Sequence, residues 1–191
     1  MPAPEKSKPL TESDVADALF QNGARGERVW RQYLCACCHR VDQYITNPTS
    51  RRAIEQAQKF IDGRITLNDL FEWHREAELA TNASWKIVLT YKLPDSWLWP
   101  LSDEVDNAWV RFLACAAADA TVQPELRPSL LPDAAAGVPA WAFARPNVRT
   151  QGINVDSESA REVVQMEWDR LNEAQRDSQV QLLLELADSV L

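Results

Sequence analysis

The sequence predicts an all-α protein, an irregular bundle of about six to seven helices. Only 5 of the 191 residues are glycine, while alanine, leucine, glutamate and arginine, which all favour helices, are abundant. Apolar residues recur at three- and four-residue steps along most of the chain, the spacing of one face of a helix. With 46% hydrophobic residues, the chain has enough apolar material to bury a core of its own.

The first predicted helix follows a Pro- and Lys-rich leader over residues 1–10, which we expect to be disordered. Thr11 with Asp14 three residues later begins this helix, and Gly23 and Gly26 are expected to end it. A long second helix is predicted from about Glu27 to Ile45. Its apolar positions predict a core stripe, with a second group of residues on another side. The core stripe comprises Trp30, Leu34, Cys37, Cys38, Val41 and Ile45, and the other group comprises Arg31, Cys35, His39 and Asp42.

The next two helices are marked by capping and stop signals. Asn47-Pro48 is expected to end the second helix, and Thr49 or Ser50 to cap a third that Asp62-Gly63 stops. Thr66 with Asp69 then predicts the start of a fourth helix. It is expected to continue through Leu89 with a kink around Asn82, and Pro94 must end it.

The second half of the chain contains two further predicted helical regions. Ser102 caps a fifth helix from about Asp103 to Ala120. Residues 122–155 hold five of the 11 prolines and are predicted to form a long irregular connection. A terminal helical region follows, expected to be broken near Asn172. We interpret residues 11–191 as a single helical domain and leave open a subdivision near 93–100.

Two of these helices share a local pattern. Residues 30–37 and 109–116 both begin with Trp and continue through an aromatic residue and Leu into small residues. Small residues let neighbouring helices approach closely, so we expect both helices to be central and to face each other.

The segment Arg28–Val41, followed by Ser50-Arg51-Arg52-Ala53-Ile54-Glu55 and Phe60-Ile61-Asp62-Gly63, resembles a paralogous helical domain of unknown function that is multiplied in planctomycete genomes. The likeness is best over residues 28–80. The chain departs from the family pattern at His39, where arginine is commoner, in its Pro-rich insert, and in lacking the usual Gly-Asn-Pro-Phe ending. The resemblance implies a helical fold and supplies no activity.

Several protein classes are disfavoured by the sequence. Its longest apolar runs, such as Leu113–Ala118, are far shorter than the roughly 20 residues of a membrane-spanning helix. Residues 1–10 have no apolar segment behind them, so they resemble neither a secretory signal nor an anchor. We therefore expect a cytoplasmic protein whose four cysteines are reduced, without a disulfide scaffold.

Catalytic and metal motifs are weak, and we expect neither an enzyme nor a cofactor. Cys35-Ala36-Cys37-Cys38-His39 matches the pattern of covalent haem attachment, but it lies inside an amphipathic helix. If any metal binds, Cys35, Cys38 and His39 are the candidate ligands, with Cys115 or His74 as the fourth. The second pair of ligands that a structural zinc site normally has is missing. We therefore interpret these cysteines as small core residues, with Cys35 and His39 at a half-buried helix border.

Charge is distributed unevenly, and this raises the question of nucleic-acid binding. The net charge of −8 arises in residues 93–191, whereas residues 25–64 carry eight basic and four acidic side chains. Such a stretch could contact phosphates as part of a larger nucleoprotein complex, although the net charge opposes duplex binding by the protein alone. The candidate phosphate contacts are Arg28, Arg31, Arg51, Arg52 and Lys59.

Protein recognition is the function that we expect, as an adaptor, regulator or inhibitor. Trp97, Trp99 and Trp141 lie in predicted loops flanked by proline, and exposed aromatic residues commonly anchor interfaces. Acidic residues of the terminal region, among them Glu162 and Asp169, could meet a basic partner. The alternative is the helical nucleoprotein subunit described above.

Overall fold

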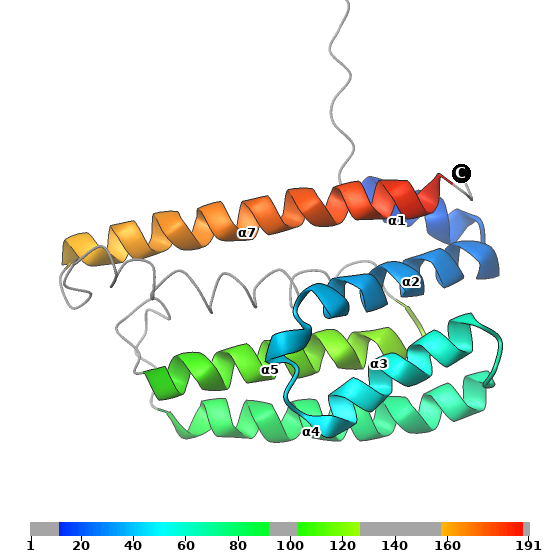
Figure 1. Ribbon diagram of the computed structural model, residues 1–191, viewed down its shortest axis with the longest axis horizontal. Coiled ribbons are helices and arrows are strands. Elements are labelled where there is room, and N and C mark those ends of the chain that lie inside the picture. Colours follow the sequence, from blue (N-terminus) through cyan, green and yellow to red (C-terminus); the bar gives the residue numbers. More distant parts are fainter. Residues whose placement is uncertain (1–11, 92–102, 127–157, 189–191) are drawn as a thin grey trace, which may run out of the picture.

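The computed structural model describes residues 12–91, 103–126 and 158–188, and over these ranges it confirms the all-α prediction (Figure 1). They form six α-helices and one 3-10 turn, without a strand. The predicted leader over 1–10, the open boundary near 93–100 and residues 127–155 of the irregular connection lie outside the described residues. The elements are α1 (Glu12–Gln21), α2 (Ala24–Arg40), η1 (Asp42–Tyr44), α3 (Pro48–Ile61), α4 (Leu67–Thr90), α5 (Asp103–Val122) and α7 (Glu158–Ala187).

Helix α2 is the centre of the bundle. It contacts α1 and α7 on one side and α3 and α5 on the other, while α3, α4 and α5 pack against one another (Figure 1). Helices α2 and α5 therefore pack against each other, as their shared sequence pattern predicts. Helix α4 forms one outer edge of the bundle and the long α7 forms the opposite edge.

The junction of α1 and α2 depends on two glycines. Gly23 has a φ of 58° and precedes α2 as its N-cap, a backbone conformation that residues with a side chain rarely adopt. Gly26 lies inside α2, where a Cβ atom would overlap the carbonyl oxygen of Leu19 on α1. The expectation that Gly26 helps to end the first helix is therefore wrong, and α2 begins at Ala24 instead of Glu27. Gly26 is in the helix because only glycine allows the two backbones to come so close.

Helix α2 also ends earlier than its apolar pattern predicts. The α-helix stops at Arg40, and the chain continues through the 3-10 turn η1. Val41 and Ile45 are nevertheless buried, so the core stripe continues across the change of helix type. The cap of α3 is Asn47, whose side chain accepts hydrogen bonds from the backbone N–H groups of Thr49 (2.8 Å) and Ser50 (3.4 Å). Neither of the caps expected at Thr49 and Ser50 is used.

The capping box predicted for α4 is confirmed. The backbone N–H of Asp69 donates to Thr66 Oγ1 (3.3 Å), and the backbone N–H of Thr66 donates to Asp69 Oδ2 (2.8 Å). Helix α4 runs without interruption to Thr90, and α5 continues two residues past the expected end. The break expected near Asn172 is absent, because α7 is a single helix of 30 residues.

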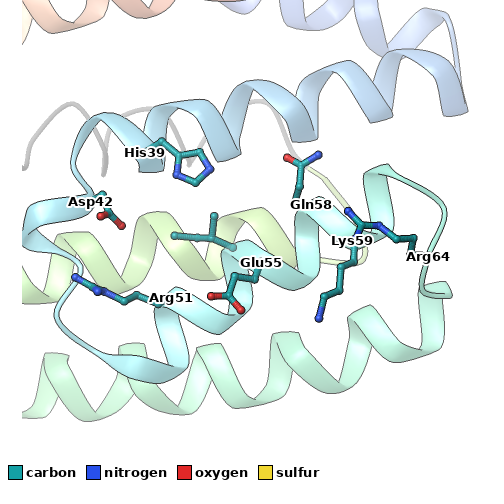
Figure 2. Close-up of a pocket in the computed structure, with 8 residues that line it drawn as sticks. His39, Asp42, Arg51, Glu55, Gln58, Lys59 and Arg64 are labelled. Carbon is teal, nitrogen blue, oxygen red and sulfur yellow. The ribbon is translucent and has the colours of Figure 1, made fainter.

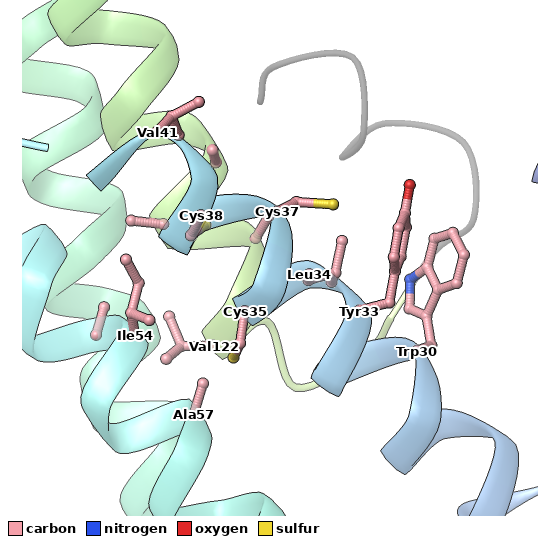
Figure 3. Close-up of a cluster of buried hydrophobic side chains, with 14 of the residues drawn as sticks. Trp30, Tyr33, Leu34, Cys35, Cys37, Cys38, Val41, Ile54, Ala57 and Val122 are labelled. Carbon is pink, nitrogen blue, oxygen red and sulfur yellow. The ribbon is translucent and has the colours of Figure 1, made fainter. Parts of the chain in front are cut away.

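The core is built around Trp30 and Tyr33, which are both fully buried on α2 (Figure 3). The Trp30 ring lies 5.1 Å from Tyr33 and 6.0 Å from Phe20 of α1, measured between ring centroids. Cys35 and Cys38 continue the buried surface of α2 toward α3 and α5, whereas Cys37 points to the other side of α2 (Figure 3). A second aromatic group joins α4 to α5, where Trp85 lies 5.7 Å from Trp109. Aromatic pairs of this kind fix the relative positions of the helices they join.

Candidate functional site

Two grooves meet at Pro124, where the first turn of α2, the α3–α4 connection and the end of α5 come together. One has a volume of about 290 Å³ and the other of about 460 Å³, and Pro124 lines both. We call their combined lining the Pro124 surface. Its first groove contains Ala24, Glu27, Arg28, Arg31, Phe60, Ile61, Gly63 and Leu67, and its second contains Phe71, His74, Glu78, Asp119, Gln123 and Glu125.

The Pro124 surface exposes two large apolar side chains. Leu67 is 52% exposed and Phe71 is 49% exposed, one helical turn apart at the start of α4. Among the described residues, six large hydrophobic side chains are exposed, and α4 carries all of them except Met166. Scattered exposed hydrophobic residues are ordinary on a protein surface. Leu67 and Phe71 each line a concave groove.

The second groove is acidic. Asp119 is hydrogen-bonded to His74, with 3.1 Å between Oδ1 and Nδ1, and Glu78 and Glu125 are exposed beside them. Burial raises the pKa of the Asp119 carboxyl above its ordinary value, while the neighbouring His74 ring acts in the opposite direction. No Ser, Thr or Cys lines this groove. The arrangement therefore offers a site for a cationic group next to an aromatic ring.

The five candidate phosphate contacts do not line one cavity. Arg28 lines the first groove of the Pro124 surface, whereas Arg51 and Lys59 line a separate pocket between α2 and α3. Arg52 is exposed and lines none of these three cavities.

Arg31 is buried, which is incompatible with the predicted phosphate contact. Its side chain is 2% exposed, and it donates hydrogen bonds to the backbone oxygens of Thr121 (2.5 Å) and Gln123 (3.0 Å). Its guanidinium lies over the Phe60 ring, 5.2 Å from the centroid. Burial lowers the pKa of Arg31 to about 10, so the group still carries its charge at neutral pH. Arg31 thus supplies donors to the end of α5, where helical carbonyls lack partners.

The cysteines and His39 do not converge on a metal site. All four cysteines are buried and form no disulfide, whereas His39 is exposed. Over the described ranges, no three His, Cys, Asp or Glu side chains are placed to hold a metal ion. Cys35 is fully buried, which corrects its expected position at a half-buried border, while His39 lies further out than expected.

The buried thiols lead to a prediction about their reactivity. Burial raises the pKa of Cys35 to about 12 and that of Cys38 well above its ordinary value. Because the thiolate is the reactive form, a disulfide reagent at about pH 8 should leave the thiols of the native protein unmodified and modify all of them in denaturant. A colorimetric thiol assay measures both. Rapid reaction of a thiol in the native protein would show that the helices around α2 open easily.

Of the remaining predicted contacts, the described residues Glu162 and Asp169 do not line the Pro124 surface. Trp97, Trp99 and Trp141 lie outside the described residues. Glu162 and Asp169 are exposed on α7, where the Asp169 carboxylate accepts a hydrogen bond from Gln165 Nε2 (2.7 Å).

Comparison with known proteins gave no match to a family model, a curated protein or a solved structure. The resemblance to the planctomycete domain therefore stays a prediction. None of the described helices is long and apolar enough to cross a membrane.

The Pro124 surface was not predicted from the sequence. In the sequence, Leu67 and Phe71 are simply apolar positions of a predicted helix, like the buried Leu70 between them. Spacing does not distinguish them from Leu70, because residues three and four apart lie on the same face of a helix. Pro124 lines both grooves because of how α5 packs against α4, and no local sequence pattern indicates this packing.

Proposed function

We propose that the protein is a non-enzymatic protein-binding module, an adaptor, regulator or inhibitor, that binds its partner through the Pro124 surface. The observation that supports this function is the pair of grooves meeting at Pro124, with Leu67 and Phe71 exposed at their rims. Binding energy at interfaces is concentrated in a few apolar or aromatic anchors that fill pockets. The Pro124 surface offers both grooves that could accept such side chains and two exposed apolar side chains, Leu67 and Phe71, that could act as anchors.

The partner should present an apolar side chain next to a basic one. The first groove offers Phe60, Ile61 and Leu67 to the apolar side chain. The second offers the carboxylates of Glu78 and Glu125, and a guanidinium placed between them could also stack on Phe71. Charge complementarity of this kind selects the partner and its orientation more than it adds affinity.

The acidic residues Glu162 and Asp169 extend this proposal along α7. Both are exposed, and a basic partner could contact them in addition to the grooves. We also propose contacts through Trp97, Trp99 and Trp141, which the described residues do not include. A cytoplasmic location is part of the proposal, and it is consistent with four cysteines that form no disulfide, because thiols stay reduced there.

The alternative, a helical subunit that contacts the backbone of a nucleic acid through residues 25–64, has less support. It requires basic side chains that follow one surface, since backbone contacts depend on charge in register. Arg31 is instead buried, and Arg28 lies in a different groove from Arg51 and Lys59.

The experiment is affinity capture from native lysate, after nuclease treatment, with the full chain and two variants of the Pro124 surface. Phe71→Ala removes the exposed ring, and Glu125→Lys reverses a charge at the acidic groove. Each should weaken capture of the partner at least about tenfold, the equivalent of roughly 1.4 kcal/mol. Leu79→Ala, exposed on α4 outside both grooves, is the matched control and should capture the partner as the parent chain does.

Two results would contradict the proposal. If the parent chain and both variants capture the same proteins equally, the Pro124 surface is not the binding site. If all partners disappear on nuclease treatment, the nucleoprotein alternative is favoured.

A further inference from the structure

A third pocket, separate from the Pro124 surface, lies between the end of α2, η1 and the outer side of α3 (Figure 2). Its volume is about 510 Å³, within the range of small-molecule sites. The buried Ile54 contributes an apolar floor, and all the other lining side chains are polar or charged. These are His39, Asp42, Arg51, Glu55, Gln58, Lys59 and Arg64.

The charged groups of this pocket are of both signs and are largely unpaired. Over the described ranges, Asp42, Glu55 and Lys59 form no ion pair, although Glu55 and Lys59 are four residues apart on α3. Such a spacing commonly allows an ion pair on a helix surface. Arg64 is paired with Asp62 outside the pocket. Figure 2 shows Asp42 and Arg51 toward one end, Lys59 and Arg64 toward the other, and Glu55 between them.

Arg51 is held in place for an anionic group. Its Nε donates a hydrogen bond to the backbone oxygen of Ile45 (2.6 Å), which fixes the plane of the guanidinium at the pocket wall. The two terminal nitrogens are left to bind a carboxylate in the paired geometry that guanidinium groups favour. A donor that is already fixed loses less conformational entropy when a ligand binds.

The mixture of charges discriminates among ligand classes. A dianion such as a phosphate monoester would have to approach the unpaired carboxylates of Asp42 and Glu55. A simple cation would face Arg51, Lys59 and Arg64. Only a ligand that carries both a negative and a positive group can pair with the basic and the acidic side chains of the pocket. An apolar part of such a ligand would contact Ile54.

We propose that this pocket binds a small zwitterion, a molecule with one carboxylate and one ammonium group on an apolar body, of which free amino acids are the simplest class. Arg51 binds the carboxylate through its two terminal nitrogens, Glu55 accepts from the ammonium group, and Ile54 contacts the apolar body. This site is distinct from the Pro124 surface, and the proposal does not depend on the proposed function.

The test is a titration of the isotopically labelled full chain with leucine, followed by the NMR signals of its backbone amides. Two analogues each lack one charge: 4-methylpentanoate has no ammonium group and 3-methylbutylamine has no carboxylate. Leucine should shift the signals of residues 39–42 and 54–59 and bind at least about tenfold more tightly than either analogue. N-acetyl-leucine amide, which is uncharged and represents leucine within a protein chain, should not bind.

Variants assign the charges. Glu55→Gln should remove the preference for leucine over 4-methylpentanoate, and Arg51→Gln should remove the preference over 3-methylbutylamine. Glu76→Gln and Arg75→Gln, which change the same residue types on the exposed face of α4, are the matched controls and should preserve both preferences. Phe71→Ala should also leave leucine binding unchanged, so this proposal and the proposed function can fail separately.

The proposal is overturned if leucine causes no shifts up to about 10 mM, a concentration that would detect even millimolar affinity. It is equally overturned if either singly charged analogue, or the uncharged amide, binds as tightly as leucine.

Discussion

Replacing Trp30 with alanine should lower the free energy of unfolding by about 3–5 kcal/mol, the usual cost of removing a fully buried large aromatic side chain. Trp30 is 0% exposed, and its ring contacts Phe20 and Tyr33, so the substitution leaves a cavity at the meeting point of α1 and α2. Globular proteins are stable by only about 5–15 kcal/mol, so the loss would be a large part of the total. Urea unfolding followed by circular dichroism measures it.

Trp30→Phe is the matched control. The indole N–H of Trp30 is buried and has no hydrogen-bond partner within the described residues. Phenylalanine keeps an aromatic ring and removes this unpaired donor, so its cost should be well below that of alanine. If the two variants were equally destabilised, the ring contacts with Phe20 and Tyr33 would not be what stabilises this part of the core.

Replacing Arg31 with alanine should lower the free energy of unfolding by about 2–4 kcal/mol. The change leaves the backbone oxygens of Thr121 and Gln123 without their donors, and each hydrogen bond from a charged group contributes roughly 1.5–3 kcal/mol. The estimate is smaller than the sum because the variant no longer buries a charge. Urea unfolding again provides the measurement, and hydrogen exchange should show faster exchange at the end of α5.

Two variants separate the contributions of Arg31. Arg31→Met keeps an unbranched stem against Phe60 and loses the hydrogen bonds, so it should lie between the alanine variant and the parent chain. Arg28→Ala removes an exposed arginine of the same helix and should change stability by no more than about 0.5 kcal/mol. Equal stability of Arg31→Met and the parent chain would show that the two hydrogen bonds contribute nothing net.

The sequence predicted most of the helices because their signals are local. The capping box of Thr66 and Asp69 lies within four residues, and the apolar spacing of α2 reports which of its sides is buried. The spacing could not show where α2 changes to a 3-10 turn, since Val41 and Ile45 are buried in either conformation. The predicted break of the terminal helix near Asn172 is wrong because a single weak helix former inside a long amphipathic pattern does not end a helix.

What could not be predicted depends on contacts between segments far apart in the sequence. Arg31 occupies a polar position by helical spacing, and it is buried because the end of α5, some 90 residues later, covers it. The same packing places Pro124 beside Leu67 and Phe71 and so creates the grooves of the Pro124 surface. The sequence predicted part of the pocket between α2 and α3, because it indicated Arg51 and Lys59 as candidate phosphate contacts. The acidic residues that the structure places beside them favour a different class of ligand.

The glycine at position 26 has a consequence for how the chain can vary. Even a methyl group there would collide with a peptide carbonyl, which is part of the main chain and has no rotamer to move out of the way. In a library covering every single substitution, this position should tolerate no replacement, whereas neighbouring Arg25 and Glu27 should tolerate many. The first helix can therefore pack against the second only because position 26 has no side chain. A sequence that lost this glycine would have to reposition its whole amino-terminal segment.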